Sequence, residues 1–171
     1  KTDGTIDGLA STSSTSPTMP SGYTYKALIG AVRTKSGSAV LVGTIQYGRS
    51  VQYTTPALPS LSSGAVGTYG STWGAAISVS ALVPTAIAAR IYVLAWNTGT
   101  NSRIVVAPNS SYDPAIDSAT KAPPVGGGGV TGASNTTTSS TVGSFLLEST
   151  NVYVSSAAST QSVVVGFDLN L

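Results

Sequence analysis

Short alternating or β-branched stretches recur along the chain, separated by Gly, Pro, Ser or Asn. Alternation with a period of two places apolar side chains on one face of a strand, so the pattern predicts β-structure. We expect about nine strands, at 26–34, 38–47, 49–54, 76–83, 88–96, 102–107, 144–148, 151–155 and 161–169. Strands at this spacing predict an all-β fold, an antiparallel β-sandwich with a jelly-roll-like arrangement.

Turn residues between these stretches suggest how the strands connect. Residues 35–37 (Lys-Ser-Gly) predict a hairpin between 26–34 and 38–47, and the strand at 49–54 is expected to continue the second arm across Gly48. Residues 97–101 (Asn-Thr-Gly-Thr-Asn) predict a second hairpin, between 88–96 and 102–107.

The stretch 86–94 has an alternative interpretation as a helix. Its apolar positions fit one helical face by spacing alone, but Tyr92, Val93 and Trp96 favour a strand because aromatic and β-branched residues suit a pleated surface. We therefore expect a strand at this position.

Residues 108–141 differ from the rest of the chain, being rich in Pro, Gly and Thr. They predict a long loop or arm, and such loops are usually functional, flexible or held by a neighbour. Gly126 to Gly129 form a run of four glycines, which we interpret as flexible loop. A phosphate-binding loop is excluded here because the Lys-Ser/Thr pair of that motif is missing.

The length of 171 residues predicts a single β-sandwich domain over residues 1–171. About 30 residues after the long loop are too few for a second core. Near the start, Asp3-Gly4 resembles the tight turn of a hairpin whose second arm is Ile6 to Leu9. Its first arm would precede Lys1, so we expect the chain to be part of a longer one.

Charged residues make up only 8% of the chain, against roughly 25% in an average soluble protein. So low a charge suits a surface largely covered by other subunits, which predicts an oligomer or a particle component. The net charge is +2 without a basic cluster, so no nucleic-acid partner is expected. No apolar run reaches the roughly 18–20 residues that predict membrane insertion.

Cysteine and histidine are both absent. Thiolate and imidazole, the usual zinc ligands and the commonest general base, are therefore excluded. We expect no enzyme, no cofactor and no metal site. A glycoside hydrolase or calcium site would need the few carboxylates, among them Asp113 and Asp117 in the long loop. Turn formation and solvation are favoured for these two residues. The other carboxylates are Asp3, Asp7, Glu148 and Asp168.

Four aromatic residues are candidates for an interface or for contact with glycans: Tyr23, Tyr25, Trp73 and Tyr112. Aromatic rings near loops can stack on sugars or anchor a partner. The alternative for Tyr23 and Tyr25 is that one packs in the core and the other on a neighbouring subunit, and the alternative for Trp73 is simple core packing. For Arg33, Arg49 and Arg90, which lie within strand patterns, we expect pairing with carboxylates or backbone carbonyls.

Residues 11–34 read STSSTSPTMPSGYTYKALIGAVRT. Together with the preceding Asp-Gly turn, this segment resembles a motif of bacteriophage tail-fibre and other virion proteins. The resemblance covers roughly residues 1–54 and extends to a block at 76–94, where Ser78 to Pro84 precede a buried strand. The segment 108–141 is not a feature of that family.

The resemblance implies a β-sandwich on the exterior of a virion, usually assembled as a trimer. We therefore expect a tail-fibre or receptor-binding module that forms a homo-oligomer, contacts other virion proteins and binds host-surface glycan. One alternative is a capsid decoration or head-fibre protein that stabilises the shell. A polysaccharide depolymerase is a further alternative that the scarcity of carboxylates disfavours.

Overall fold

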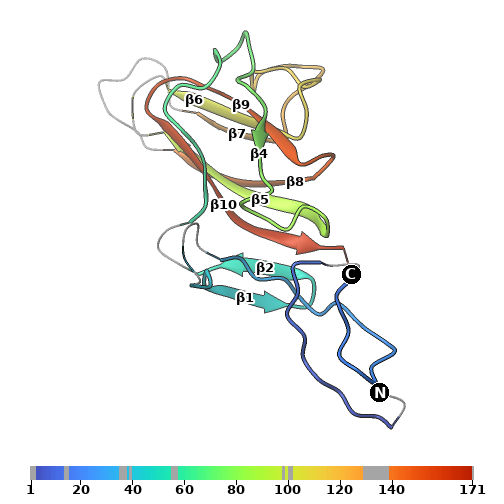
Figure 1. Ribbon diagram of the computed structural model, residues 1–171. Coiled ribbons are helices and arrows are strands. Elements are labelled where there is room, and N and C mark those ends of the chain that lie inside the picture. Colours follow the sequence, from blue (N-terminus) through green and yellow to red (C-terminus); the bar gives the residue numbers. More distant parts are fainter. Residues whose placement is uncertain are drawn as a thin grey trace.

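The structure is a computed structural model that describes residues 3–13, 16–34, 38, 40–54, 58–97, 99, 102–128 and 139–170. Ten strands occur in these residues and form two antiparallel sheets, which confirms the predicted all-β sandwich (Figure 1). No helix of the described part of the chain is long and apolar enough to span a membrane.

Six strands form the larger sheet, in the order β1-β2-β10-β5-β8, with β3 also paired to β10. Their bounds are β1 Thr44–Tyr47, β2 Ser50–Tyr53, β3 Ser60–Ser63, β5 Ala88–Asn97, β8 Ser140–Leu146 and β10 Thr160–Leu169. The smaller sheet has the order β4-β9-β6-β7, with β4 Ile77–Ser78, β6 Arg103–Ala107, β7 Val125–Gly128 and β9 Asn151–Ser156.

The core lies between the two sheets and follows the alternation of their strands. In β5, Ile91, Val93 and Ala95 are fully buried, whereas their neighbours on the strand are half-buried. Ile104 and Val154 of the smaller sheet belong to the same apolar cluster. The strand interpretation of this stretch is therefore confirmed over the helical one.

The predicted strand at 26–34 is wrong. Within it only Thr34 forms a bridge, to Leu41, and the amide of Val42 donates to the carbonyl of Arg33 at 2.7 Å. The predicted strand at 38–47 is limited to β1, and the turn residues 35–37 lie outside the described residues. The alternating pattern is present, but an alternating segment becomes a strand only where a partner supplies hydrogen bonds along it.

The chain also turns where continuation was expected. Gly48 has φ of 57°, a conformation that glycine adopts at little cost, and it closes a hairpin between β1 and β2. Conversely, β5 and β6 are not a hairpin, because β5 pairs with β10 and β8 while β6 pairs with β7 and β9. The chain crosses from one sheet to the other between them.

Three further expectations are corrected. The strand predicted at 76–83 is limited to β4. A turn follows it, in which the carbonyl of Val79 accepts hydrogen bonds from the amides of Leu82 and Val83. Residues 6–9 form no strand beside the Asp3-Gly4 turn. Residues 125–128 form β7 where the sequence predicts a flexible loop, and Gly129 lies outside the described residues.

Glycine fits β7 because the strand lies against a loop. A Cβ atom at Gly126 would overlap the side chain of Ile116, which packs over the strand. The long predicted loop therefore contains a strand of the smaller sheet, and its last residues, Ser140 and Thr141, already belong to β8.

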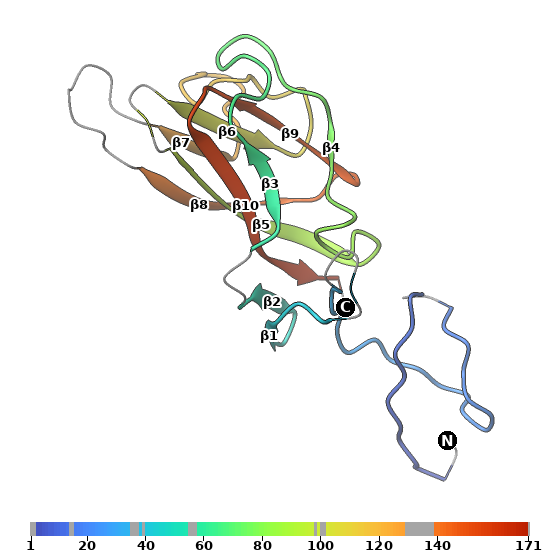
Figure 2. The same ribbon diagram turned by 60° about the vertical axis from the view of Figure 1, so that its left-hand side comes forward.

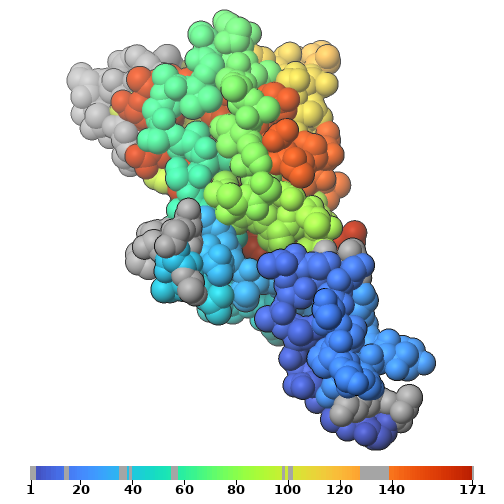
Figure 3. All heavy atoms as spheres, in the orientation of Figure 1, coloured from blue at the N-terminus to red at the C-terminus, as the bar shows by residue number. Residues whose placement is uncertain are grey.

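The described parts of residues 3–34 are hereafter called the N-terminal arm. The last residues of the arm contact the sandwich: Gln46 Nε2 donates to the carbonyl of Ile29 at 2.6 Å, and Ala31 packs against the core. Both ribbon views show the arm, in blue, extending away from the sandwich beyond the β1-β2 hairpin (Figures 1 and 2). The space-filling view shows it as a protrusion from the body of the molecule (Figure 3). The loops that precede β4 and follow β6 lie at the opposite end.

Candidate interaction surfaces

Trp73 joins two loops at the end of the sandwich away from the N-terminal arm. Its indole Nε1 donates to the carbonyl oxygen of Tyr112 at 2.9 Å, and its ring meets that of Tyr153 edge-on, with centroids 6.4 Å apart. The side chain is half-buried. The structure thus brings together two of the four aromatic candidates, and it gives Trp73 a packing role inside the chain.

Tyr69 also links these two loops. Sequence patterns did not identify it as a candidate residue. Its hydroxyl accepts a hydrogen bond from the amide of Ile116 at 3.0 Å, and the amide of Gly70 donates to the carbonyl of Pro114 at 2.8 Å. The guanidinium of Arg103 lies 5.7 Å from the Tyr69 ring centroid, within the range of a cation–π contact. Its place in the same Gly- and Thr-rich segment as Trp73 was the available signal.

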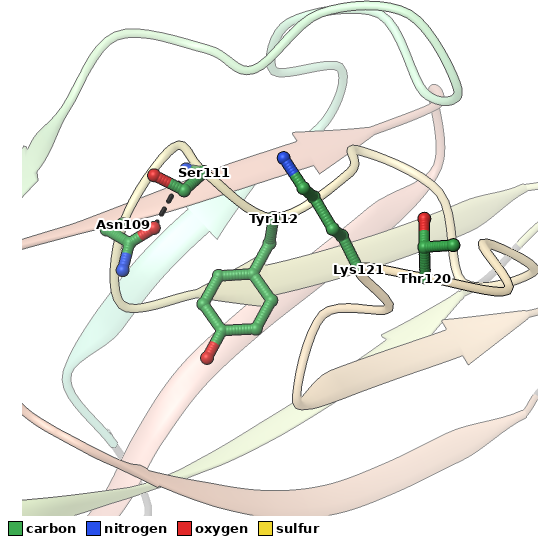
Figure 4. A pocket seen from close by; sticks show the side chains of 5 residues that line it. All are labelled: Asn109, Ser111, Tyr112, Thr120 and Lys121. Carbon is green, nitrogen blue, oxygen red and sulfur yellow. Dashed lines mark hydrogen bonds between the residues drawn. The ribbon is translucent and has the colours of Figure 1, made fainter.

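A depression of about 310 Å³ lies beside this joint (Figure 4). It is lined by an aromatic ring, an amide, hydroxyls and an ammonium group, from Asn109, Ser111, Tyr112, Thr120 and Lys121. These groups suit a carbohydrate, which needs an aromatic face and several hydrogen-bonding partners. Figure 4 shows the Lys121 amine and the Tyr112 hydroxyl pointing in opposite directions, so only part of this lining converges on one ligand.

Tyr23 and Tyr25 lie on the N-terminal arm, so the structure does not bring them to Trp73 and Tyr112. Tyr23 is half-buried, and its amide donates to the carbonyl of Pro20 at 3.2 Å. Tyr25 is 80% exposed. The four candidates therefore belong to two surfaces at opposite ends of the molecule.

The carboxylates are dispersed, and several of them accept hydrogen bonds from nearby groups. Asp113 accepts a bond from the hydroxyl of Ser118, and Glu148 accepts one from the amide of Asn109. Hydrogen bonds from Thr5 lower the pKa of Asp3 below its usual value. In the described part of the chain, no three acidic residues gather in a cluster that could hold a metal ion.

Arg33, Arg49 and Arg90, the three arginines for which the sequence predicts pairing, donate hydrogen bonds within the chain. Arg33 Nε donates to the carbonyl of Ala81 at 2.5 Å, and Arg49 Nε donates to that of Leu169 at 2.9 Å, as expected from the sequence. Arg90 Nη1 instead donates to the hydroxyl of Ser144 at 3.1 Å.

Arg90 lies in a row of five residues that crosses the outer face of the larger sheet, hereafter the outer row. The strand register places Tyr47, Ser50, Asp168, Arg90 and Leu146 side by side. Paired residues point to the same side of a sheet, and the next row faces the core, with Val51, Phe167, Ile91 and Phe145 all buried. The two ends of the outer row are apolar and exposed, Tyr47 at 90% and Leu146 at 57%.

The middle of the outer row is polar. Asp168 accepts hydrogen bonds from the hydroxyls of Ser50, at 2.8 Å, and Tyr92, at 2.9 Å. The bond to Asp168 raises the pKa of Tyr92 above its usual value, because it stabilises the protonated phenol. A shallow cleft of about 350 Å³ lies here, lined by Arg49, Ser50, Ala89, Arg90, Leu146 and Asp168. Periodicity alone did not identify this cleft because its residues come from four strands and a turn.

Comparison of the chain with protein-family models, curated proteins and solved structures finds no match. The resemblance to virion proteins therefore rests on the residues quoted above.

Large apolar side chains are exposed mainly near the N-terminus. Those exposed in the described residues lie in the arm (Ile6, Leu9, Tyr25, Leu28, Ile29, Val32), in and just before β1 (Val40, Leu41, Ile45, Tyr47), in β8 (Val142, Leu146) and at Ile116. Exposed apolar patches mark interaction sites in soluble proteins, and most of these side chains lie on the arm and β1. β1 is also an edge strand, whose outer backbone groups can pair with another chain.

Proposed function

We propose that the chain is a structural module of a bacteriophage virion, such as a tail-fibre or receptor-binding segment, that assembles with copies of itself and attaches to the host surface. The observation behind this proposal is the separation of two surfaces. Exposed apolar side chains gather on the N-terminal arm and β1, whereas the loops at the other end present a polar depression. The apolar end suits association with other copies of the chain, and the polar end suits binding to the host surface.

Assembly also explains the composition. A surface with few charges and an exposed apolar arm is costly in water, and covering it by association removes that cost. We propose a symmetric homo-oligomer, a trimer, on the exterior of the particle. Weak contacts from several copies would then combine through effective concentration, so a shallow depression on each copy suffices for firm attachment.

The ligand that fits the depression is a surface polysaccharide, because the lining combines the ring of Tyr112 with amide, hydroxyl and ammonium groups. The test is binding of the purified, labelled oligomer to an array of bacterial surface polysaccharides. We expect saturable binding that falls at least about tenfold for Tyr112→Ala and Lys121→Ala, while Asp117→Ala, an exposed residue outside the lining, leaves it unchanged.

A second candidate function is a capsid decoration or head-fibre protein. The observation that favours it is the arm, which projects beyond the β1-β2 hairpin and suits a segment laid across neighbouring shell subunits. A decoration protein should bind empty capsids tightly and no polysaccharide. Intact oligomer without saturable polysaccharide binding would therefore contradict host attachment and favour this candidate.

We propose a binding role without catalysis. A depolymerase would release reducing sugar from the polysaccharide it binds, and it would lose that activity in Asp113→Ala or Glu148→Ala. Release of reducing sugar by the unaltered chain would contradict this part of the proposal.

A further inference from the structure

Two arginines line the cleft of the outer row, and the hydrogen bonds that their guanidinium groups make go to neutral oxygens. Arg49 Nε donates to the carbonyl oxygen of Leu169 at 2.9 Å, and Arg90 Nη1 donates to the hydroxyl of Ser144 at 3.1 Å. A guanidinium group has five N–H donors. Each of the two arginines therefore keeps donors, and a positive charge, for a ligand in the cleft.

The carboxylate in the lining of the cleft is also held by neutral groups. Asp168 Oδ1 accepts a hydrogen bond from the hydroxyl of Ser50, and its Oδ2 accepts one from the hydroxyl of Tyr92. The lining thus contains two positive side chains and one negative side chain, which leaves it positive. Arg49 and Ser50 are exposed and Arg90 is half-buried, so a solute can reach these groups.

We infer that this cleft binds a carboxylate-bearing sugar, which makes the polysaccharide that the chain recognises an acidic one. Charge complementarity identifies the occupant, because the planar donor pairs of Arg49 and Arg90 match the two oxygens of a carboxylate. The inference rests on the host attachment proposed above, and it adds the charge of the polymer and a second contact with it.

The rest of the lining suits a sugar better than a small inorganic anion. Each carboxylate oxygen of Asp168 can accept a second hydrogen bond, which the hydroxyls of a sugar can donate. Leu146 is 57% exposed and offers an apolar wall for the C–H groups of a sugar ring. The cleft volume of about 350 Å³ lies near the lower end of the range for small-molecule sites, which suits a single sugar residue. A bare anion would use the arginines alone and would be repelled by Asp168.

The cleft and the depression beside Tyr112 can be tested separately, because they share no lining residue. Weak contacts at both places on many copies combine through effective concentration, so neither has to bind a sugar tightly. For one sugar in the cleft we expect a dissociation constant on the order of 1 to 10 mM.

The experiment is titration of the purified, isotope-labelled chain, in its native oligomeric state, with glucuronate and with galacturonate, followed by amide chemical shifts. Glucose is the matched control, because it differs from glucuronate by the absence of the carboxylate. We expect saturable shifts at Ser50, Arg90 and Asp168 with at least one of the two sugar acids, and none of this kind with glucose. Raising the salt concentration from about 0.05 M to about 0.5 M should weaken the binding several-fold, because salt screens the charges.

Arginine variants test whether the two guanidinium groups carry the binding. Arg49→Gln and Arg90→Gln should each weaken it by at least about fivefold, since each loses charge-assisted hydrogen bonds. Arg90→Lys keeps the charge and should retain more binding than Arg90→Gln. Lys26→Gln, which removes the same charge from the exposed arm, is the control and should leave binding unchanged. Circular dichroism of each variant verifies the fold.

The outcomes separate this inference from the proposed function. Equal shifts with glucose, no saturable shifts with either sugar acid, or full binding by both glutamine variants would overturn the inference, and host attachment would still stand if the polysaccharide array shows saturable binding. Glycerol 3-phosphate carries an anion without a sugar ring, so tighter binding of this probe would also overturn the choice of a sugar acid. Sugar acids that bind in the cleft of a chain that binds no polysaccharide on the array would support the cleft assignment and contradict host attachment.

Discussion

The indole nitrogen of Trp73 donates a hydrogen bond to the carbonyl oxygen of Tyr112, 39 residues further along the chain, at 2.9 Å. This bond and the edge-on contact with Tyr153 tie the loop before β4 to the loop after β6 and to the smaller sheet. The position of the proposed polysaccharide-binding depression thus depends on an aromatic residue that does not line it.

Replacing Trp73 by Phe should loosen this joint. The change leaves the Tyr112 carbonyl without its donor and shrinks the contact with Tyr153, so we expect a loss of about 1 to 2 kcal/mol in the free energy of unfolding. The loop should also open more often, which trypsin cleavage at Lys121 measures. Trp96→Phe, the same change on β5, is the control and should leave cleavage at Lys121 unaltered; equal cleavage in both variants would contradict the role given to Trp73.

Gly166 allows β2 and β10 to approach. A Cβ atom there would overlap the backbone carbonyl of Val51, which cannot move without breaking the pairing of the two strands. Gly166→Ala should therefore lower the free energy of unfolding by about 1 to 3 kcal/mol in urea denaturation. At Gly127 the nearest atom to such a Cβ is the Ala95 carbonyl at 3.4 Å, an ordinary contact, so Gly127→Ala should stay within about 1 kcal/mol of the parent.

Tyr53 makes stability sensitive to alkaline pH. Burial raises the pKa of its phenol to about 12, and its hydroxyl donates to the carbonyl of Leu82. Because the folded state holds this proton more tightly than the unfolded chain, its contribution is complete below pH 10 and is lost between pH 10 and 12. At 1.36 kcal/mol per pKa unit, the loss is about 3 kcal/mol.

The measurement is urea denaturation of the parent and of Tyr53→Phe at several values of pH from 8 to 12. Tyr53→Phe removes the titrating group, so its stability should fall less steeply over the upper part of this range. A residual slope is expected because the pKa of Tyr92 is also raised. Parallel curves for the two proteins would contradict the assignment to Tyr53.

Two exposed apolar residues of β1 should matter for association and not for folding. Ile45 and Tyr47 point to the outer face and are largely exposed, so Ile45→Asp and Tyr47→Asp should change stability by less than about 0.5 kcal/mol. The double variant Ile45→Asp/Tyr47→Asp should show a larger fraction of monomer than the parent in sedimentation velocity at the same concentration. Ala119→Asp, an exposed change in the loop 108–124, is the control and should leave the distribution as it is.

Sequence patterns predicted the long central strands and missed what depends on distant partners. The sequence predicts β5, β9 and β10 almost to their ends because Val, Ile and Leu recur at alternate positions along them. β7 was missed because its glycines have no side chains to show a period, and its strand character comes from pairing with β6. The segment 26–34 shows the opposite case, an alternating pattern whose described residues find only one bridge.

The candidate surfaces were predictable only in part, for the same reason. Aromatic residues in Gly- and Ser-rich segments indicated Trp73, but the loop that receives its hydrogen bond lies far away in the sequence. The outer row combines residues of five strands, which only the register brings together. Low charge, in contrast, is visible in the composition, and it leads to the same expectation of association as the exposed arm.

The solution mass of the purified chain, measured by light scattering over a wide range of concentrations, tests the central claim most directly. An assembling virion module should give a mass three times that of the 17.0 kDa chain, unchanged on dilution. A mass of one chain at every concentration would contradict the proposed self-association.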